Sequence, residues 1–158
     1  MKQFYVLLFS LISLYDIKAQ ENASISLSGS YNVYPVDSVG VVLLNRNLRK
    51  LSNGDLALSF LGLNPQLEKK WENMYPFSSG LAPVFQQVTA AGIVILFSDK
   101  DGKRYEVIKA NSEFGDYERF QYEFSQPVLI EELTYYYDNI WAAGTIGGLP
   151  SIFKLKPD

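Results

Sequence analysis

Carboxylates are the side chains in this sequence with the clearest capacity for catalysis. His and Cys are absent from the 158 residues, so no Ser-His-Asp or Cys-His nucleophile can be assembled, and the preferred zinc ligands are missing. Glu131 and Glu132 are adjacent, with Glu123 and Asp138 nearby, and a glycoside hydrolase uses a carboxylate pair. Adjacent residues of a regular strand point to opposite faces, however, so this pair cannot line one pocket. We interpret these residues as solvated groups at strand edges and predict no catalytic residue.

A second acidic pattern could suggest a metal site. Asp99, Asp101 and Gly102 have the spacing of part of a calcium loop. If Gly102 took the glycine position of an EF-hand loop, Phe97 and Ile108 would be its first and last ligands, and neither offers a side-chain oxygen. We therefore predict a polar hairpin turn in which Gly102 supplies a positive φ angle. No metal ligand and no cofactor are predicted.

The aromatic residues near the C-terminus are the best candidates for binding. Tyr135, Tyr136 and Tyr137 are consecutive, and Trp141 follows closely. Alternate residues of a strand share a face, so Tyr135 and Tyr137 should point together while Tyr136 points away. Aromatic rings on a sheet can stack on sugars or anchor a protein partner, although the same residues also pack within half-buried strands. We predict Tyr135, Tyr137 and Trp141 as the binding residues, for an unknown protein or glycan.

The net charge limits the classes of binding partner, and the N-terminal segment indicates the cellular location. The formal net charge is −3 with scattered Lys and Arg, which argues against a nucleic-acid partner because phosphate binding needs clustered positive charge. Residues 1–19 combine Lys2, an apolar run and a terminal Ala19, the pattern of a secretory signal peptide cleaved near Ala19–Gln20. The run is too short to span a bilayer. We expect a secreted or periplasmic domain over residues 20–158, with no membrane span.

A motif recurs along this domain. Its three copies stand at a fixed spacing of 46 residues: Leu61–Gln66, Val107–Ser112 and Phe153–Asp158. A period of this length is typical of repeat architectures, in which each unit buries its apolar face against its neighbours.

Short apolar and aromatic runs separated by Gly, Pro, Asn and Asp predict an all-β protein. Each repeat contains one continuous apolar run that we expect to be a strand buried on both faces, at Val41–Leu44, Ile93–Phe97 and Ile140–Ala143. Asn53-Gly54 predicts a type I′ hairpin turn, because both central residues of that turn have positive φ. The count is four strands in each of the first two units and three in the last, eleven in all. A β-sandwich is the alternative architecture.

The segments Leu61–Trp71, Ile140–Thr145 and Ser151–Asp158 resemble blades of secreted bacterial β-propeller-like repeat proteins. The resemblance extends over about Val39 to Asp158 and implies about three four-stranded antiparallel blades in an incomplete or open propeller. Its motifs concern packing, so it implies no catalytic residue. Pro76–Val84 also resembles the start of a WG-type β-repeat, whose Gly-Lys-Trp-Gly core is absent here.

These observations favour a secreted, non-catalytic β-repeat module with a binding or structural role, or part of a longer propeller. The alternative is a fragment of a carboxylate-dependent glycan hydrolase or lyase on a propeller scaffold. Because a partial ring leaves sheets without neighbours, we also expect self-association through open sheet edges.

Overall fold

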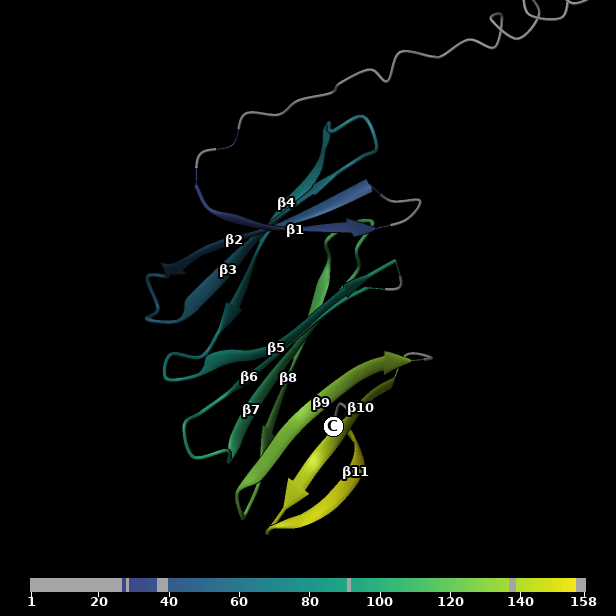
Figure 1. Cartoon of the computed structure of the whole chain (residues 1–158). Helices are drawn as coiled ribbons and strands as arrows, with labels where there is room; N and C mark the ends of the chain where they lie inside the picture. Colours follow the sequence, from purple (N-terminus) through teal and green to yellow (C-terminus); the bar gives the residue numbers. More distant parts are fainter. Residues whose placement is uncertain (1–26, 28, 37–39, 91, 137–138, 156–158) are drawn as a thin grey trace, which may run out of the picture.

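The computed structural model describes residues 27, 29–36, 40–90, 92–136 and 139–155, which form eleven strands in three antiparallel sheets (Figure 1). Within each sheet, consecutive strands are neighbours. The first sheet contains β1 (Tyr31–Val36), β2 (Gly40–Lys50), β3 (Leu56–Leu63) and β4 (Lys69–Phe77). The middle sheet contains β5 (Ala82–Thr89), β6 (Gly92–Ser98), β7 (Arg104–Ala110) and β8 (Tyr117–Glu123). The third sheet contains β9 (Val128–Tyr136), β10 (Asn139–Ile146) and β11 (Leu149–Leu155).

The predicted all-β fold of blade-like sheets is confirmed. The described residues contain no helix long and apolar enough to cross a membrane. The predicted signal peptide, residues 1–19, lies outside the described residues.

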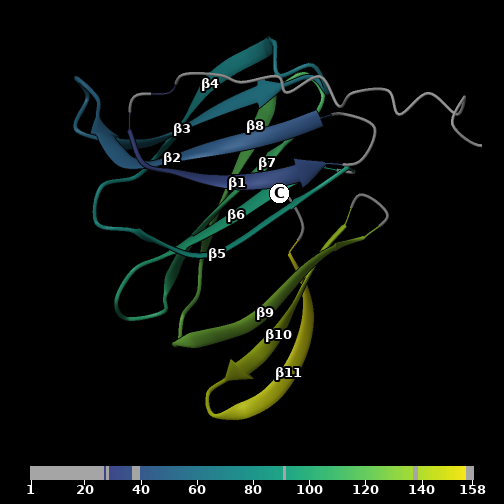
Figure 2. The ribbon, with the colours of Figure 1, turned by 45° about the horizontal axis from the view of Figure 1, so that its top comes forward.

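The middle sheet lies between the other two, as the two views in Figures 1 and 2 agree. One core joins it to the first sheet and a second core joins it to the third. Every residue of β6 is buried, which confirms the two-sided burial expected for Ile93–Phe97. In β10 that expectation is wrong, since Ile140 and Ala142 are buried but Trp141 is exposed. The third sheet has a described neighbour on one face only, so alternate residues of β10 face outward.

The pairing ladders identify equivalent positions in the three sheets. In each sheet the start of the second strand pairs with the end of the third, at Val41–Leu63, Ile93–Ala110 and Ile140–Leu155. Counting from these pairs makes Leu61 equivalent to Ile108 and Phe153. The fixed period aligned Leu61 with Val107 instead, so it is wrong by one residue in the middle copy. In a strand, that slip exchanges the two faces of the sheet.

One predicted hairpin turn, between β2 and β3, has a different turn type in the structure. In the β2–β3 turn the carbonyl of Leu51 accepts a hydrogen bond from the Gly54 amide (3.1 Å), and Gly54 has a φ of 91°. Asn53 does not have a positive φ, so the predicted type I′ turn at Asn53-Gly54 is wrong. A turn with positive φ at both central residues occurs between β10 and β11 instead, at Gly147 (φ 59°) and Gly148 (φ 82°).

Two asparagines build similar loops after the third strand of the first two sheets. The Asn64 side-chain oxygen accepts hydrogen bonds from the Gln66 and Glu68 amides, and the Asn111 oxygen accepts from the Glu113 and Phe114 amides. Each loop then has a residue in the left-handed conformation, Leu67 in the first and Gly115 in the second. The second loop packs against the first sheet, where its Gly115 carbonyl accepts hydrogen bonds from two side chains, Asn73 at 2.7 Å and Tyr75 at 3.1 Å.

Candidate functional site

The outer face of the third sheet, turned away from the middle sheet, carries a group of exposed apolar side chains. Ile140 and Ala142 belong to the inner core, so Trp141 between them points outward. Four large side chains on this face are accessible to solvent: Leu129 (57% exposed), Tyr136 (62%), Trp141 (40%) and Ile152 (80%). We refer to these four residues as the outer patch. Lys154, whose Nζ lies 6.0 Å from the Trp141 ring centroid, stands beside it.

The structure does not bring all the predicted binding residues together. Tyr135 pairs with Ile140 and packs against the inner core, and Lys109 Nζ lies 5.0 Å from its ring centroid. Trp141 is on the opposite face, where Tyr136 accompanies it. Tyr137 lies outside the described residues.

Strand periodicity separated Tyr135 from Tyr136 but did not reveal which of the two faces outward. The sequence offered one signal of the inward face: the apolar Leu133 stands two residues before Tyr135, shares its face and is buried.

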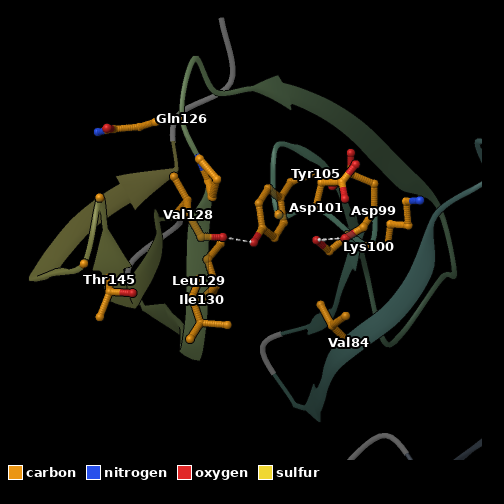
Figure 3. A pocket seen from close by; sticks show the side chains of 15 residues that line it. Val84, Asp99, Lys100, Asp101, Tyr105, Gln126, Val128, Leu129, Ile130 and Thr145 are labelled. Carbon is orange, nitrogen blue, oxygen red and sulfur yellow. Dashed lines mark hydrogen bonds between the residues drawn. The ribbon is translucent and has the colours of Figure 1, made fainter.

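A cavity of about 630 Å³ lies between the middle and third sheets, where the β6–β7 hairpin meets β9 (Figure 3). Its walls include the apolar side chains of Val84, Val128 and Ile130. The Tyr105 hydroxyl at this site donates a hydrogen bond to the Val128 carbonyl, and the Val128 amide donates to the Gly102 carbonyl at 2.8 Å. These polar groups therefore join the two sheets.

The carboxylate of Asp99, at the edge of this cavity, closes the hairpin. It accepts hydrogen bonds from the Lys103 amide (2.9 Å) and the Arg104 amide (3.3 Å), and Gly102 has a φ of 65°. The predicted polar hairpin is confirmed. The backbone hydrogen bond from Lys103 is the largest cause that lowers the pKa of Asp99, with further help from Arg104. Among the described residues, no group of three or more acidic side chains is placed to hold a metal ion.

Glu106 is the most buried carboxylate of the described chain and joins the segment after β4 to the middle sheet. It is 3% exposed and accepts hydrogen bonds from the Ser78 amide, the Ser78 hydroxyl and the Gln121 amide group. Arg119 binds both of its oxygens, at 2.9 and 3.1 Å. Burial by itself would raise the pKa of Glu106, but the hydrogen bonds from Arg119, Ser78 and Gln121 outweigh it and lower the pKa. Glu106 is thus held as a structural anion.

The acidic pair noted in the sequence does not form a pocket. Glu132 pairs with Ala143, and the register then shifts so that Glu131 is the extra residue of a bulge in β9. Both side chains are exposed, and neither lines the cavity between the middle and third sheets. Asp138 lies outside the described residues.

Comparisons with models of protein families, with curated proteins and with solved structures give no significant match to this chain.

Proposed function

We propose that this chain is a secreted, non-catalytic β-repeat module that binds a protein partner through the outer patch of its third sheet. The observation that supports this function most directly is the exposure of Leu129, Tyr136, Trp141 and Ile152 on one sheet face. Several large apolar side chains exposed on one sheet face are costly in water and are typical of interaction sites.

The composition of the outer patch favours a protein over a glycan. Trp141 and Tyr136 could stack on a sugar ring, but Ile152 and Leu129 are aliphatic and offer no ring. An aromatic and aliphatic centre beside charged residues such as Lys154 and Glu132 is the composition of a protein interface, in which a few buried anchors supply most of the affinity.

The enzymatic alternative, a carboxylate-dependent glycan hydrolase or lyase fragment, has less support. Such an enzyme needs two carboxylates facing one substrate site. Glu106 is committed to Arg119 and Ser78, Asp99 is committed to its hairpin, and Glu131 and Glu132 are exposed at a bulge. Glu106 and Asp99 therefore serve the fold, and Glu131 and Glu132 line no described cavity.

Photo-cross-linking tests the binding function. A photoreactive residue at position 136 should capture one protein reproducibly from the culture medium, whereas the same residue at position 114 should not, although Phe114 is also 63% exposed. The affinity of the captured protein, measured by titration calorimetry, should fall about tenfold or more in Trp141→Ala/Ile152→Ala. An unchanged affinity would contradict the proposal. Glycan-array binding that disappears in Trp141→Ala but persists in Ile152→Ala would favour the glycan instead.

Export is part of the same proposal and has a separate test. The signal-like residues 1–19 support cleavage after Ala19. Mass spectrometry of the protein from the exported fraction should show a chain that begins at Gln20, and retention of Met1 there would contradict this.

A further inference from the structure

We propose that the protein bound by the outer patch is a second copy of this chain, so that the third sheet of each copy packs on the first sheet of the other and two chains close a ring of six sheets. This inference rests on the proposed binding function and specifies its partner. The contact is between sheet faces, in the same order in which the three sheets already stack within one chain.

Equivalent positions show that the outer patch is a docking face. Phe60, Val107 and Ile152 occupy the same position in the three sheets. Phe60 is 1% exposed because the middle sheet covers it, and Val107 is 0% exposed because the third sheet covers it, yet Ile152 is 80% exposed. The next position on the same face repeats the pattern, with Val42 and Val94 buried and Trp141 exposed. The third sheet thus presents the apolar face that the other two use to bind the sheet that follows.

The first sheet presents the complementary face. This face of the first sheet contains Val41, Leu43 and Leu61. The equivalent residues of the middle sheet, which pack on the first sheet, are Ile93, Ile95 and Ile108. The equivalent residues of the third sheet, which pack on the middle sheet, are Ile140, Ala142 and Phe153. Val33, which pairs with Leu43 on this outward face of the first sheet, is 62% exposed, whereas Leu43 is 4% exposed and Val41 and Leu61 are half-buried. One end of the stack therefore has an exposed face for a following sheet, and the other end offers Val33 on the face equivalent to those that bind a preceding sheet.

The arrangement of the sheets favours closure with two copies. Between sheets, the strand pairs with the most close backbone approaches are β1 with β5 and β5 with β9. Sheets that approach most closely along one strand fan around an axis on that side. Closed rings of such sheets contain about four to eight blades. The described residues of one chain form three sheets, and two copies of these residues supply six, which lies within that range.

The test is the oligomeric state of residues 20–158, measured by sedimentation over a range of micromolar concentrations. The wild-type chain should form dimers. Ile152→Glu and Val33→Glu should each weaken self-association by about tenfold or more, because each places a charge in one half of the contact. Phe114→Glu, an equally exposed position elsewhere, should leave the dimer intact. Circular dichroism and thermal unfolding establish that each variant is folded.

Mixing the two variants distinguishes this contact from others. A head-to-tail contact leaves one intact junction when Ile152→Glu meets Val33→Glu, so the mixture should recover dimers that neither variant forms alone. Dimers that survive Val33→Glu would overturn the proposal, as would a wild-type monomer or growth to open oligomers. If the wild-type chain is monomeric but position 136 still cross-links another protein, the binding function stands and the second copy is wrong as its partner. If the outer-patch variants change no binding at all, both proposals fail.

Discussion

Glu106 is expected to contribute strongly to stability for a single residue, because it ties the segment after β4 to two strands of the middle sheet. Its carboxylate is buried, and all the groups around it donate to the charged form. Charge-assisted hydrogen bonds of this kind contribute more than neutral ones, and a buried donor or acceptor left without its partner is costly.

We therefore expect Glu106→Gln to lower the free energy of unfolding by about 2 kcal/mol at neutral pH. Since folding lowers the pKa of Glu106, its stabilising contribution is complete above the ordinary pKa of glutamate, about 4.3, and is lost as the pH falls through the lower folded value. The loss of stability in that acidic window should be smaller in the variant. Urea unfolding across the pH range measures both effects, and the exposed Glu132→Gln is the control. A variant with the wild-type pH profile would contradict this role.

Gly62 is a second residue whose identity follows from its surroundings. A Cβ atom at this position would lie 2.3 Å from the indole of Trp71, which fills the space between the first sheet and Gly115 of the middle sheet. The Trp71 indole nitrogen also donates to the Ser112 carbonyl at 3.2 Å. The indole is therefore fixed, and the glycine makes room for it.

We expect Gly62→Ala to destabilise the protein by about 1–3 kcal/mol through overpacking. Trp71→Phe should also destabilise it, but the double variant should cost less than the sum of the two by about 0.5 kcal/mol or more, because the smaller ring leaves space for the methyl group. Denaturant unfolding of the four proteins in the cycle gives this coupling energy. Strict additivity would show that the indole does not occupy that space.

At the scale of single elements, the two asparagine loops allow a direct comparison of backbone conformation. Leu67 has a φ of 62°, and it is the one residue other than glycine with a positive φ in the described chain. The corresponding place in the second loop has Gly115, with a φ of 75°. An L-residue with a side chain loses roughly 1–2 kcal/mol in this conformation, whereas glycine does not.

Leu67→Gly should accordingly raise the free energy of unfolding by up to about 1 kcal/mol, because the relieved strain exceeds the greater flexibility of glycine in the unfolded chain. Gly115→Ala should have the opposite sign and a larger effect, since its Cβ would also lie 2.6 Å from the Trp71 ring. Thermal unfolding measures both variants. A stabilised Gly115→Ala protein would show that the loop conformation is different.

The strands themselves were the most predictable elements. The predicted apolar runs Val41–Leu44, Ile93–Phe97 and Ile140–Ala143 all lie within observed strands, because short apolar runs bounded by Gly, Asn or Ser are typical of strands. The middle repeat was misplaced by one residue, since a fixed period cannot register the different lengths of the loops. The face of Tyr136 and the conformation of Asn53 depend on tertiary contacts and on turn length, which local residue patterns do not encode.

Across the whole molecule, the two sheet junctions differ in kind. The first and middle sheets are joined by Trp71, Asn73 and Tyr75 on the Asn111 loop and by the ion pair of Arg119 with Asp55. The described contacts between the middle and third sheets include the Tyr105 hydroxyl with the Val128 carbonyl, the Val128 amide with the Gly102 carbonyl, and the Lys109 ammonium over Tyr135. The third sheet was thus predictable as a unit, but the way it is attached was not, because the attachment depends on which side chains meet across the junction.

We expect these different junctions to set the order in which the three sheets unfold under force. When the chain is pulled between residues 30 and 155 in an optical trap, the third sheet should detach first and the first and middle sheets should yield together at higher force, because their junction contains the Arg119–Asp55 ion pair and the buried, hydrogen-bonded Trp71 indole. Glu106→Gln should lower the second rupture force and leave the first unchanged. A single rupture that includes all three sheets, or an initial loss of the first sheet, would contradict this order. A protein exposed to tension or to translocation through a narrow pore would therefore lose and regain the outer patch while its other two sheets remain folded.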